Sequence, residues 1–349
     1  MPKHLPRPVL RPPVPAVRGR RRLGLVTVVA AAVLAVVGSG AAEASTPTVT
    51  TGLRSPAAAL PVGLPGTTGV LRLSTTLSPS TTVVRDDRGV VATFTAGART
   101  VTLRGPLRTF AEPSTTSATV STTTWVRLLA EPSTGAPDWA WLAAALVDAS
   151  PDVLGTATQY TTGAPERTDV TGARLAGDAS YGPYVGTTRL AGADFNDYLG
   201  VAWTYPTSVD RPEADQLGAL DCSGYVRMVL GRRGGVPLAL APDGRGLPRR
   251  SFEILASGPG VQTQANTGRR PALPASLAAG DLVFFDASAD DGTRVDHVGI
   301  YLGADSTGAP RFLSSRVRAD GPTMGDIGGR STLSGTGLYA SSFRAVRRV

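Results

Sequence analysis

Cysteine and histidine are almost absent from this sequence. The 349 residues include one cysteine, Cys222, and two histidines, His4 and His297. A single cysteine excludes an internal disulfide framework. His4 belongs to a segment that we expect to be removed, so one thiol and one imidazole remain, too few for a Cys/His zinc site. We therefore expect no metal and no cofactor, and the thiol is either a small buried hydrophobic group or a reactive one.

Lysine is equally scarce, since Lys3 is the only one and nearly every base is arginine. Residues 1–44 hold seven of the 35 basic residues and one of the 27 acidic ones, so the rest of the chain has a net charge of only +2. The only basic run left is the short end formed by Arg344, Arg347 and Arg348. The high isoelectric point therefore does not indicate nucleic-acid binding.

The N-terminal segment has the three-part layout of a secretory signal peptide. An arginine cluster at 18–22 precedes an apolar run at 23–37, and Ala-Glu-Ala at 42–44 offers a cleavage site. An uncleaved anchor is the alternative, because the apolar character approaches the roughly 20 residues that span a bilayer. Gly-Ser-Gly at 38–40 favours cleavage after residue 44, which leaves no stable membrane span. The export route, general or twin-arginine, stays open.

Two segments of different composition follow. Residues 45–68 are rich in Thr, Pro, Ala and Gly, which predicts a flexible linker because little apolar surface can be buried. Residues 69–165 contain short β-like segments at 90–95 and 99–105, then an amphipathic helix at 138–149. They predict a small β-rich module with a helix. The lack of an aromatic row or basic strip favours a packing or spacer role over wall binding.

Cys222 lies in the stretch LDCSGYVRMVL at 220–230. Val226 and Val229 follow it at i+4 and i+7, which predicts a helix that begins near the cysteine. Free N–H groups and the helix dipole at that end stabilise a thiolate, the form that attacks a carbonyl carbon. A nearby imidazole would lower the thiol pKa further. An inert buried cysteine is the alternative.

His297 lies in the second of three predicted strands, at 280–286, 295–303 and 310–316. It shares side-chain parity with Gly299, which leaves room beside the imidazole. Val298, Ile300 and Leu302 alternate to the other face and are expected to be core. A lone histidine is more often structural, but this one is the only partner for the only thiol. A Cys/His pair also needs a third group to orient the imidazole, and only one of Ser314 and Ser315 can face it.

These motifs resemble those of the NlpC-type papain-like cell-wall peptidases. The match comprises DCSGYV around Cys222, GDLVFF at 280–285, HVGIYLG at 297–303 and the FLSSR that follows. They occur in the family's order and cover most of 195–349, but nothing before it. The resemblance implies an α+β fold, with a papain-like domain at 195–349 whose core helix carries the cysteine and packs on a small antiparallel sheet.

The resemblance also implies catalytic roles. Cys222 corresponds to the nucleophile, and His297 to the general base that later protonates the leaving amine. Ser314 takes the position of the polar residue, often His or Asn, that orients the imidazole. A serine hydroxyl is short and uncharged, so it holds an imidazole weakly.

Four further residues are implied to bind substrate. The family's Gly-x-Pro-Tyr-x-Trp-Gly-Gly element is replaced here by LGVAWTYP at 199–206, with Trp203 in the tyrosine position and Tyr205 in the tryptophan position. By resemblance, Asp221 and Trp203 are expected to recognise the free amino end of a stem peptide. Asp221 and Ser223 flank the thiol, and either could cap the helix or contact substrate.

The function implied by the resemblance is that of an exported, monomeric thiol hydrolase at the cell wall. It would cut peptidoglycan stem peptides between D-glutamate and the diamino acid, and the arginine-rich composition suggests an actinobacterial source. A wall-binding protein of the same fold without turnover is one alternative. An amidase or transpeptidase that uses the same nucleophile is another.

Overall fold

The structure is a computed structural model that describes residues 63–288 and 292–349. The expected signal peptide at 1–44 and most of the expected linker at 45–68 lie outside the described residues. Within the described ranges, no helix has the length and apolarity needed to cross a membrane. The described residues belong to one compact unit. The boundaries expected inside it, at 165 and 195, remain predictions.

The first sheet is a five-stranded antiparallel meander in chain order. Its strands are β1 (Arg72–Leu77), β2 (Ser80–Asp86), β3 (Gly89–Thr95), β4 (Thr100–Ala111) and β5 (Thr119–Leu128). Helix α1 (Trp139–Val147) packs on it through the fully buried Leu142. The helix predicted at 138–149 is thus confirmed, and Asp138 is its N-cap, whose carboxylate accepts a hydrogen bond from Trp141 N at 3.0 Å.

Short elements lead from this sheet to the second one. They are α2 (Val153–Ala157), the 3₁₀ helix η1 (Thr158–Tyr160), β6 (Arg167–Thr168), β7 (Arg174–Ala176), β8 (Tyr184–Val185), β9 (Thr188–Arg189), α3 (Phe195–Leu199), β10 (Trp203–Tyr205), β11 (Ser208–Asp210) and the 3₁₀ helix η2 (Ala214–Gln216). The six short strands pair as three two-stranded hairpins, β6 with β7, β8 with β9 and β10 with β11.

The second sheet has six antiparallel strands in the order β12-β17-β13-β14-β15-β16. They are β12 (Val261–Gln264), β13 (Leu282–Phe285), β14 (His297–Ala304), β15 (Pro310–Arg316), β16 (Gly321–Thr323) and β17 (Phe343–Arg348). The helical elements of this region are α4 (Cys222–Val226), which continues as the π-helix η3 (Arg227–Arg232), then α5 (Ser251–Ser257) and α6 (Leu338–Ser342). Strands β13 to β15 confirm the three strands predicted around His297.

The two faces of β14 are buried by different partners. Val298, Ile300 and Leu302 belong to the same apolar cluster as Cys222 on α4, as their parity predicted. The other face, which carries His297, packs against a second cluster that includes Phe285, Phe312 and Tyr339. Burial of a phenylalanine side chain stabilises the fold by about 1.5–3 kcal/mol, so packing on both faces of β14 contributes to stability.

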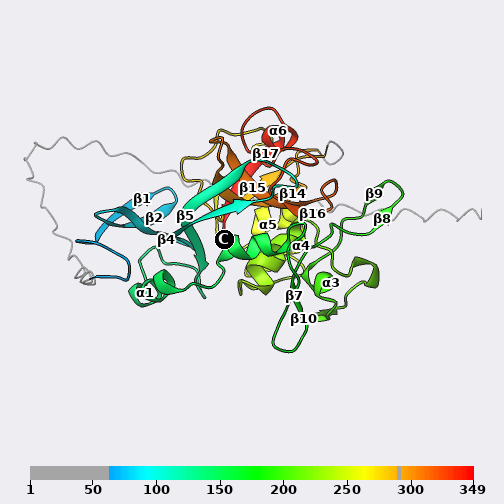
Figure 1. Cartoon of the computed structure of the whole chain (residues 1–349), viewed down its shortest axis with the longest axis horizontal. Coiled ribbons are helices and arrows are strands. Elements are labelled where there is room, and N and C mark those ends of the chain that lie inside the picture. The colour runs from blue at the N-terminus through cyan, green and yellow to red at the C-terminus, as the bar shows by residue number, and fades with distance from the viewer. Residues whose placement is uncertain (1–62, 289–291) are drawn as a thin grey trace, which may run out of the picture. The chain divides into compact units, whose positions relative to one another are not determined.

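The hairpin formed by β4 and β5 connects the two sheets. In Figure 1 these long strands extend from the first sheet toward the second. Thr119 at the start of β5 and Ser306 after β14 exchange two hydrogen bonds, Ser306 N to Thr119 O at 2.7 Å and Thr119 N to Ser306 Oγ at 3.2 Å. Val120 and Val126 of β5 lie in the same core as α4 and β14. The first sheet therefore contributes to the core of the region that carries the thiol.

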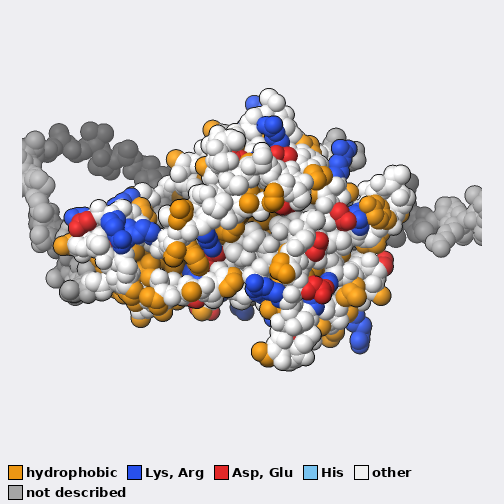
Figure 2. Space-filling view, in the orientation of Figure 1, with side chains coloured by type: hydrophobic (Ala, Val, Ile, Leu, Met, Phe, Trp, Pro, Cys, Tyr) orange, Lys and Arg blue, Asp and Glu red, His pale blue; other side chains and the backbone are white. Residues whose placement is uncertain are grey.

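The surface is of mixed character. Figure 2 shows acidic and basic side chains in small groups of both signs on the face drawn there, and hydrophobic side chains gathered around α1 and the first sheet. The exposed hydrophobic residues of this region include Leu77, Leu107 and Val147. On this face the charges do not form the continuous basic strip that nucleic-acid binding would require.

Candidate active site

Cys222 is the first residue of α4, as predicted. The preceding Asp221 is the N-cap, and its carboxylate accepts a hydrogen bond from Gly224 N at 2.7 Å. Gly224 is required here because a Cβ at this position would lie 2.2 Å from the carbonyl oxygen of Ala193. The thiol Sγ lies 3.8 Å from the carbonyl oxygen of Asp296, the residue before His297. The helix start and the strand start therefore meet at one corner.

The Asp221 carboxylate is fully enclosed by hydrogen-bond donors. Arg249 donates to it at 2.7 Å and 3.2 Å, Gly192 N at 3.0 Å and the Ser223 hydroxyl at 3.2 Å. Burial alone would raise the pKa of Asp221, but the charge of Arg249 and these hydrogen bonds keep that pKa below its ordinary value. Asp221 is therefore a buried, ionised group beside the thiol.

The thiol is neutral, contrary to the prediction of a lowered thiol pKa. Burial, and then the charge of Asp221, raise the pKa of Cys222 to about 12. The main-chain N–H of Val298 on β14, the charge of Arg249 and the main-chain N–H of Ser223 in the first turn of α4 favour the thiolate, but their effects are smaller. The side chain is only 6% exposed, so desolvation of the thiolate outweighs the helix end.

His297 begins β14, opposite Phe285 on β13. Its Nε2 lies 3.0 Å from the Ser314 Oγ on β15, and its ring packs between Phe285 and Tyr339, with centroid distances of 5.8 Å and 5.2 Å. Burial, and then the charge of Arg316, lower the pKa of His297 to about 3. The imidazole is therefore a neutral base at neutral pH.

Ser314 joins His297 to a buried arginine. The Arg316 Nε donates to the Ser314 Oγ at 3.0 Å, while the rest of the guanidinium donates to Gly329 O at 2.6 Å and to the Ser331 hydroxyl. Ser315, which has the opposite parity, donates to Leu220 O on the side of α4. Of the two serines, Ser314 is thus the one that contacts the imidazole.

Two cavities lie at this corner, and Tyr181 lines both. The first, of about 170 Å³, is lined by Asp221, Cys222 and Ser223 together with residues of the segments 250–252 and 294–296. The second, of about 300 Å³, is lined by His297, Arg316, Arg318, Tyr339 and their neighbours. The thiol and the imidazole therefore face adjoining spaces, which suits a substrate that passes from one to the other.

Comparison with known proteins adds a family assignment. Residues 205–321, which include Cys222, His297 and Ser314, match the NlpC/P60 family. The chain carries an NlpC/P60 domain. This agrees with the resemblance of the sequence motifs and with the α+β fold class.

The chain also has a match among solved structures. It is a crystal structure from Staphylococcus aureus subsp. aureus Mu50, of a protein similar to a lipoprotein of the NLP/P60 family. The two chains are 20% identical, and the match covers 63% of this chain with a TM-score of 0.26. It spans half, 50%, of the solved chain. None of the curated proteins matches this chain.

The structure does not bring Trp203 and Tyr205 to the two cavities. Trp203 packs edge-on against Phe195 with centroids 5.0 Å apart. Tyr205 is buried, and its hydroxyl accepts a hydrogen bond from Arg227. Their substrate-binding role remains a prediction, whereas Asp221 and Ser223 do line the cavity at the thiol.

Three residues at the site were missed by the sequence analysis: Tyr181, Arg249 and Arg316. Tyr181 precedes the short strand β8, and Arg249 lies in a loop before α5. Neither has a periodic pattern or a motif that would have marked it. Arg316 stands in the FLSSR motif itself, and its charge inside a strand buried on both faces was the one available signal.

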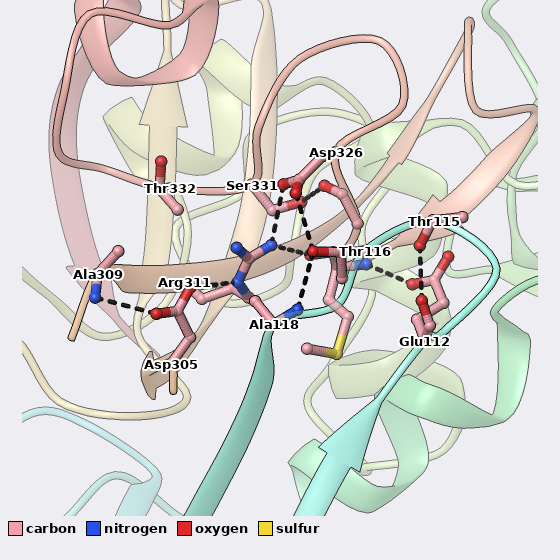
Figure 3. Close-up of polar contacts among 12 residues, drawn as sticks. Glu112, Thr115, Thr116, Ala118, Asp305, Ala309, Arg311, Asp326, Ser331 and Thr332 are labelled. Carbon is pink, nitrogen blue, oxygen red and sulfur yellow. Dashed lines mark hydrogen bonds and ion pairs between the residues drawn. The ribbon is translucent and has the colours of Figure 1, made fainter. Parts of the chain in front are cut away.

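The second cavity is supported by the tip of the β4–β5 hairpin. Figure 3 shows Glu112 of this tip and the contacts around it. Its carboxylate accepts hydrogen bonds from Thr323 Oγ1 at 2.7 Å and from Met324 N at 2.8 Å. Thr116 donates to Asp326 at 2.8 Å. The hairpin therefore holds the segment 323–331, whose carbonyl and hydroxyl groups bind Arg316.

Proposed function

We propose that the protein is an exported cysteine peptidase that hydrolyses an amide bond in peptidoglycan stem peptides, between D-glutamate and the diamino acid. The observation that carries the proposal is the meeting of Cys222, at the start of α4, with the start of the His297 strand inside an NlpC/P60 domain. The signal-like N-terminal segment supports export and a location in the cell wall. We further propose that it acts as a monomer.

The neutral thiol and imidazole imply general-base catalysis rather than a preformed ion pair. As Sγ of Cys222 bonds to the carbonyl carbon, its proton passes to His297. Since Nε2 is engaged with Ser314, Nδ1 is the nitrogen available to receive this proton. The imidazolium then protonates the leaving amine as the C–N bond breaks, and a thioester remains. Water, deprotonated by the neutral imidazole, hydrolyses the thioester and restores the thiol.

The raised thiol pKa favours a second candidate. A wall-binding protein of the same fold without turnover needs no reactive thiolate, and a buried thiol beside a carboxylate suits such a protein. An amidase or transpeptidase would use the same nucleophile and differ only in the bond or the acceptor. These alternatives predict different products from the same substrate.

Mass spectrometry of peptidoglycan fragments tests the proposal directly. The wild-type protein should release fragments with new D-glutamyl carboxyl and diamino acid amino termini, and Cys222→Ala should release none while it still binds the wall. The exposed Asp215 provides a matched control, since Asp215→Asn should release the same fragments as the wild type. Wall binding without new termini in any variant would instead support the second candidate, and cross-linked products would support a transpeptidase.

A further inference from the structure

The cavity beside His297 is positively charged. Its lining includes Arg316 and Arg318, and none of its lining residues is acidic. Arg318 is exposed, and no ion pair is recorded for it within the described residues. A cavity of this size with two guanidinium groups and no counter-charge favours an anionic occupant.

Arg316 is buried without a carboxylate partner among the described residues. It is 2% exposed, and its hydrogen bonds go to hydroxyl and carbonyl oxygens, which are all neutral. The nearest acidic side chains that influence it, Glu112 and Asp326, are themselves engaged, Glu112 by Thr323 and Met324 and Asp326 by Arg311. A buried charge that lacks a counter-ion is costly, and a bound anion would reduce that cost.

Two tyrosine hydroxyls are available to such an anion. Tyr339 is 6% exposed, its ring packs against His297, and the Arg316 Cζ lies 4.3 Å from its centroid. Tyr181 is 7% exposed. In the described part of the chain neither hydroxyl has a hydrogen-bond partner, although both residues line the cavity. Neither hydroxyl is among the buried side-chain atoms of the described residues that lack a partner, so both are open to the cavity and can donate to a ligand there.

We propose that this cavity is a subsite that binds a carboxylate in the part of the substrate that leaves with the amine. The Tyr339 hydroxyl donates to the carboxylate, and Arg316 and Arg318 supply the opposite charge. This inference rests on the proposed function: His297 protonates the leaving amine, so the segment beyond that amine lies on the imidazole side. A diamino acid whose side chain ends in a carboxylate fits the subsite, whereas the ammonium group of a lysine side chain is repelled by the two arginines.

Binding can be measured apart from catalysis with the full chain carrying Cys222→Ala. The probes are L-Ala-γ-D-Glu-meso-diaminopimelate, the same tripeptide with its side-chain carboxyl as carboxamide, and L-Ala-γ-D-Glu-L-Lys. Calorimetric titration should give a dissociation constant for the first that is lower by about tenfold than for the others, the usual effect of a charge-assisted hydrogen bond. When Tyr339→Phe or Arg318→Gln is introduced into the Cys222→Ala protein, this preference for the first probe should be reduced. Arg330→Gln, an exposed arginine of the neighbouring loop, should retain it.

Equal affinity for the three probes would overturn the subsite. So would a preference for the diaminopimelate probe that neither Tyr339→Phe nor Arg318→Gln reduces. Cleavage of the same probes by the wild-type protein separates the two proposals. If all three are cut with equal kcat/KM, the hydrolase stands and the subsite fails. If the carboxylate preference is seen in binding and none is cut, the subsite stands and the hydrolase fails.

Discussion

The Ser314 Oγ lies 3.0 Å from both the Nε2 of His297 and the Nε of Arg316. Because Arg316 can only donate, it occupies one lone pair of this oxygen. Ser314 can then either accept a hydrogen bond from Nε2–H or donate one to an unprotonated Nε2. Only the first arrangement leaves Nδ1 free as a base. A carboxylate or amide oxygen, which only accepts, would fix that tautomer more strictly.

Ser314→Ala tests whether this contact supports catalysis. The variant removes the group that orients the imidazole, so we expect kcat to fall by about tenfold, the low end of general-base contributions, with little change in KM. Steady-state kinetics on stem peptides give both constants. Nitrogen NMR of His297 in the two proteins should show a change in the balance of tautomers.

A matched control is Ser341→Ala, since Ser341 is an exposed serine on α6 whose hydroxyl bonds only to main-chain carbonyls. It should leave kcat and the histidine spectrum unchanged. A folded Ser314→Ala protein with wild-type kcat would show that the hydroxyl does not orient the base.

The local part of the site could be predicted from the sequence. The start of a helix, the position of a strand and the parity of its side chains depend on residues that are near neighbours in the chain. Sequence patterns of this kind placed Cys222 at the first turn of α4, and His297 and Ser314 on adjacent strands. The parity argument also predicted space at Gly299. That space is taken up by Phe312, whose Cδ2 would lie 2.7 Å from a Cβ there.

The electrostatics of the site could not be predicted in this way. The thiol pKa depends on burial and on Asp221 more than on the helix end, and burial is set by the whole fold. Tyr181 and Arg249 reach the thiol from loops 41 and 27 residues away in sequence, where no periodic pattern indicates position. Long-range approach of this kind follows from tertiary packing and not from local propensity.

Asp221 should control the reactivity of the thiol. Its charge raises the pKa of Cys222, so Asp221→Asn, which keeps an oxygen to cap α4, should lower that pKa and speed alkylation at a given pH. The single cysteine makes the rate with iodoacetamide specific to this site. In the wild type the rate should be low at pH 7 and rise steadily toward pH 10. Asp215→Asn, at an exposed aspartate, is the control, and equal rates in a folded Asp221→Asn protein would contradict the assignment.

His297 should make the fold sensitive to acid. Its pKa falls from 6.5 to about 3 on folding, so between these values the unfolded chain binds a proton that the folded chain does not. The free energy of unfolding should therefore decrease as the pH drops from about 6.5 to 3, by up to about 1.4 kcal/mol per pH unit for this group. Urea denaturation at pH 7 and pH 4 measures the change. His297→Gln should show a smaller loss, and an identical loss would mean that other groups cause it.

Glu112 should couple the β4–β5 hairpin to the wall of the second cavity. Glu112→Gln removes the charge and leaves one of its two buried donors, Thr323 Oγ1 or Met324 N, without an acceptor. We expect the free energy of unfolding to fall by about 1.5–3 kcal/mol, the contribution of a hydrogen bond to a charged group. Hydrogen exchange at the Met324 amide should accelerate, because the Glu112 carboxylate is its acceptor.

The exposed Glu131, which pairs with Arg99 at 3.0 Å and is 85% exposed, is the matched control. Glu131→Gln should change stability by less than about 1 kcal/mol and leave Met324 exchange unchanged. Since the segment 323–331 supplies the acceptors of Arg316, Glu112→Gln should also weaken binding of the diaminopimelate tripeptide to the Cys222→Ala protein. If Met324 exchanges at the wild-type rate in Glu112→Gln, the hairpin does not hold this segment, and the first sheet has no influence on the site through Glu112.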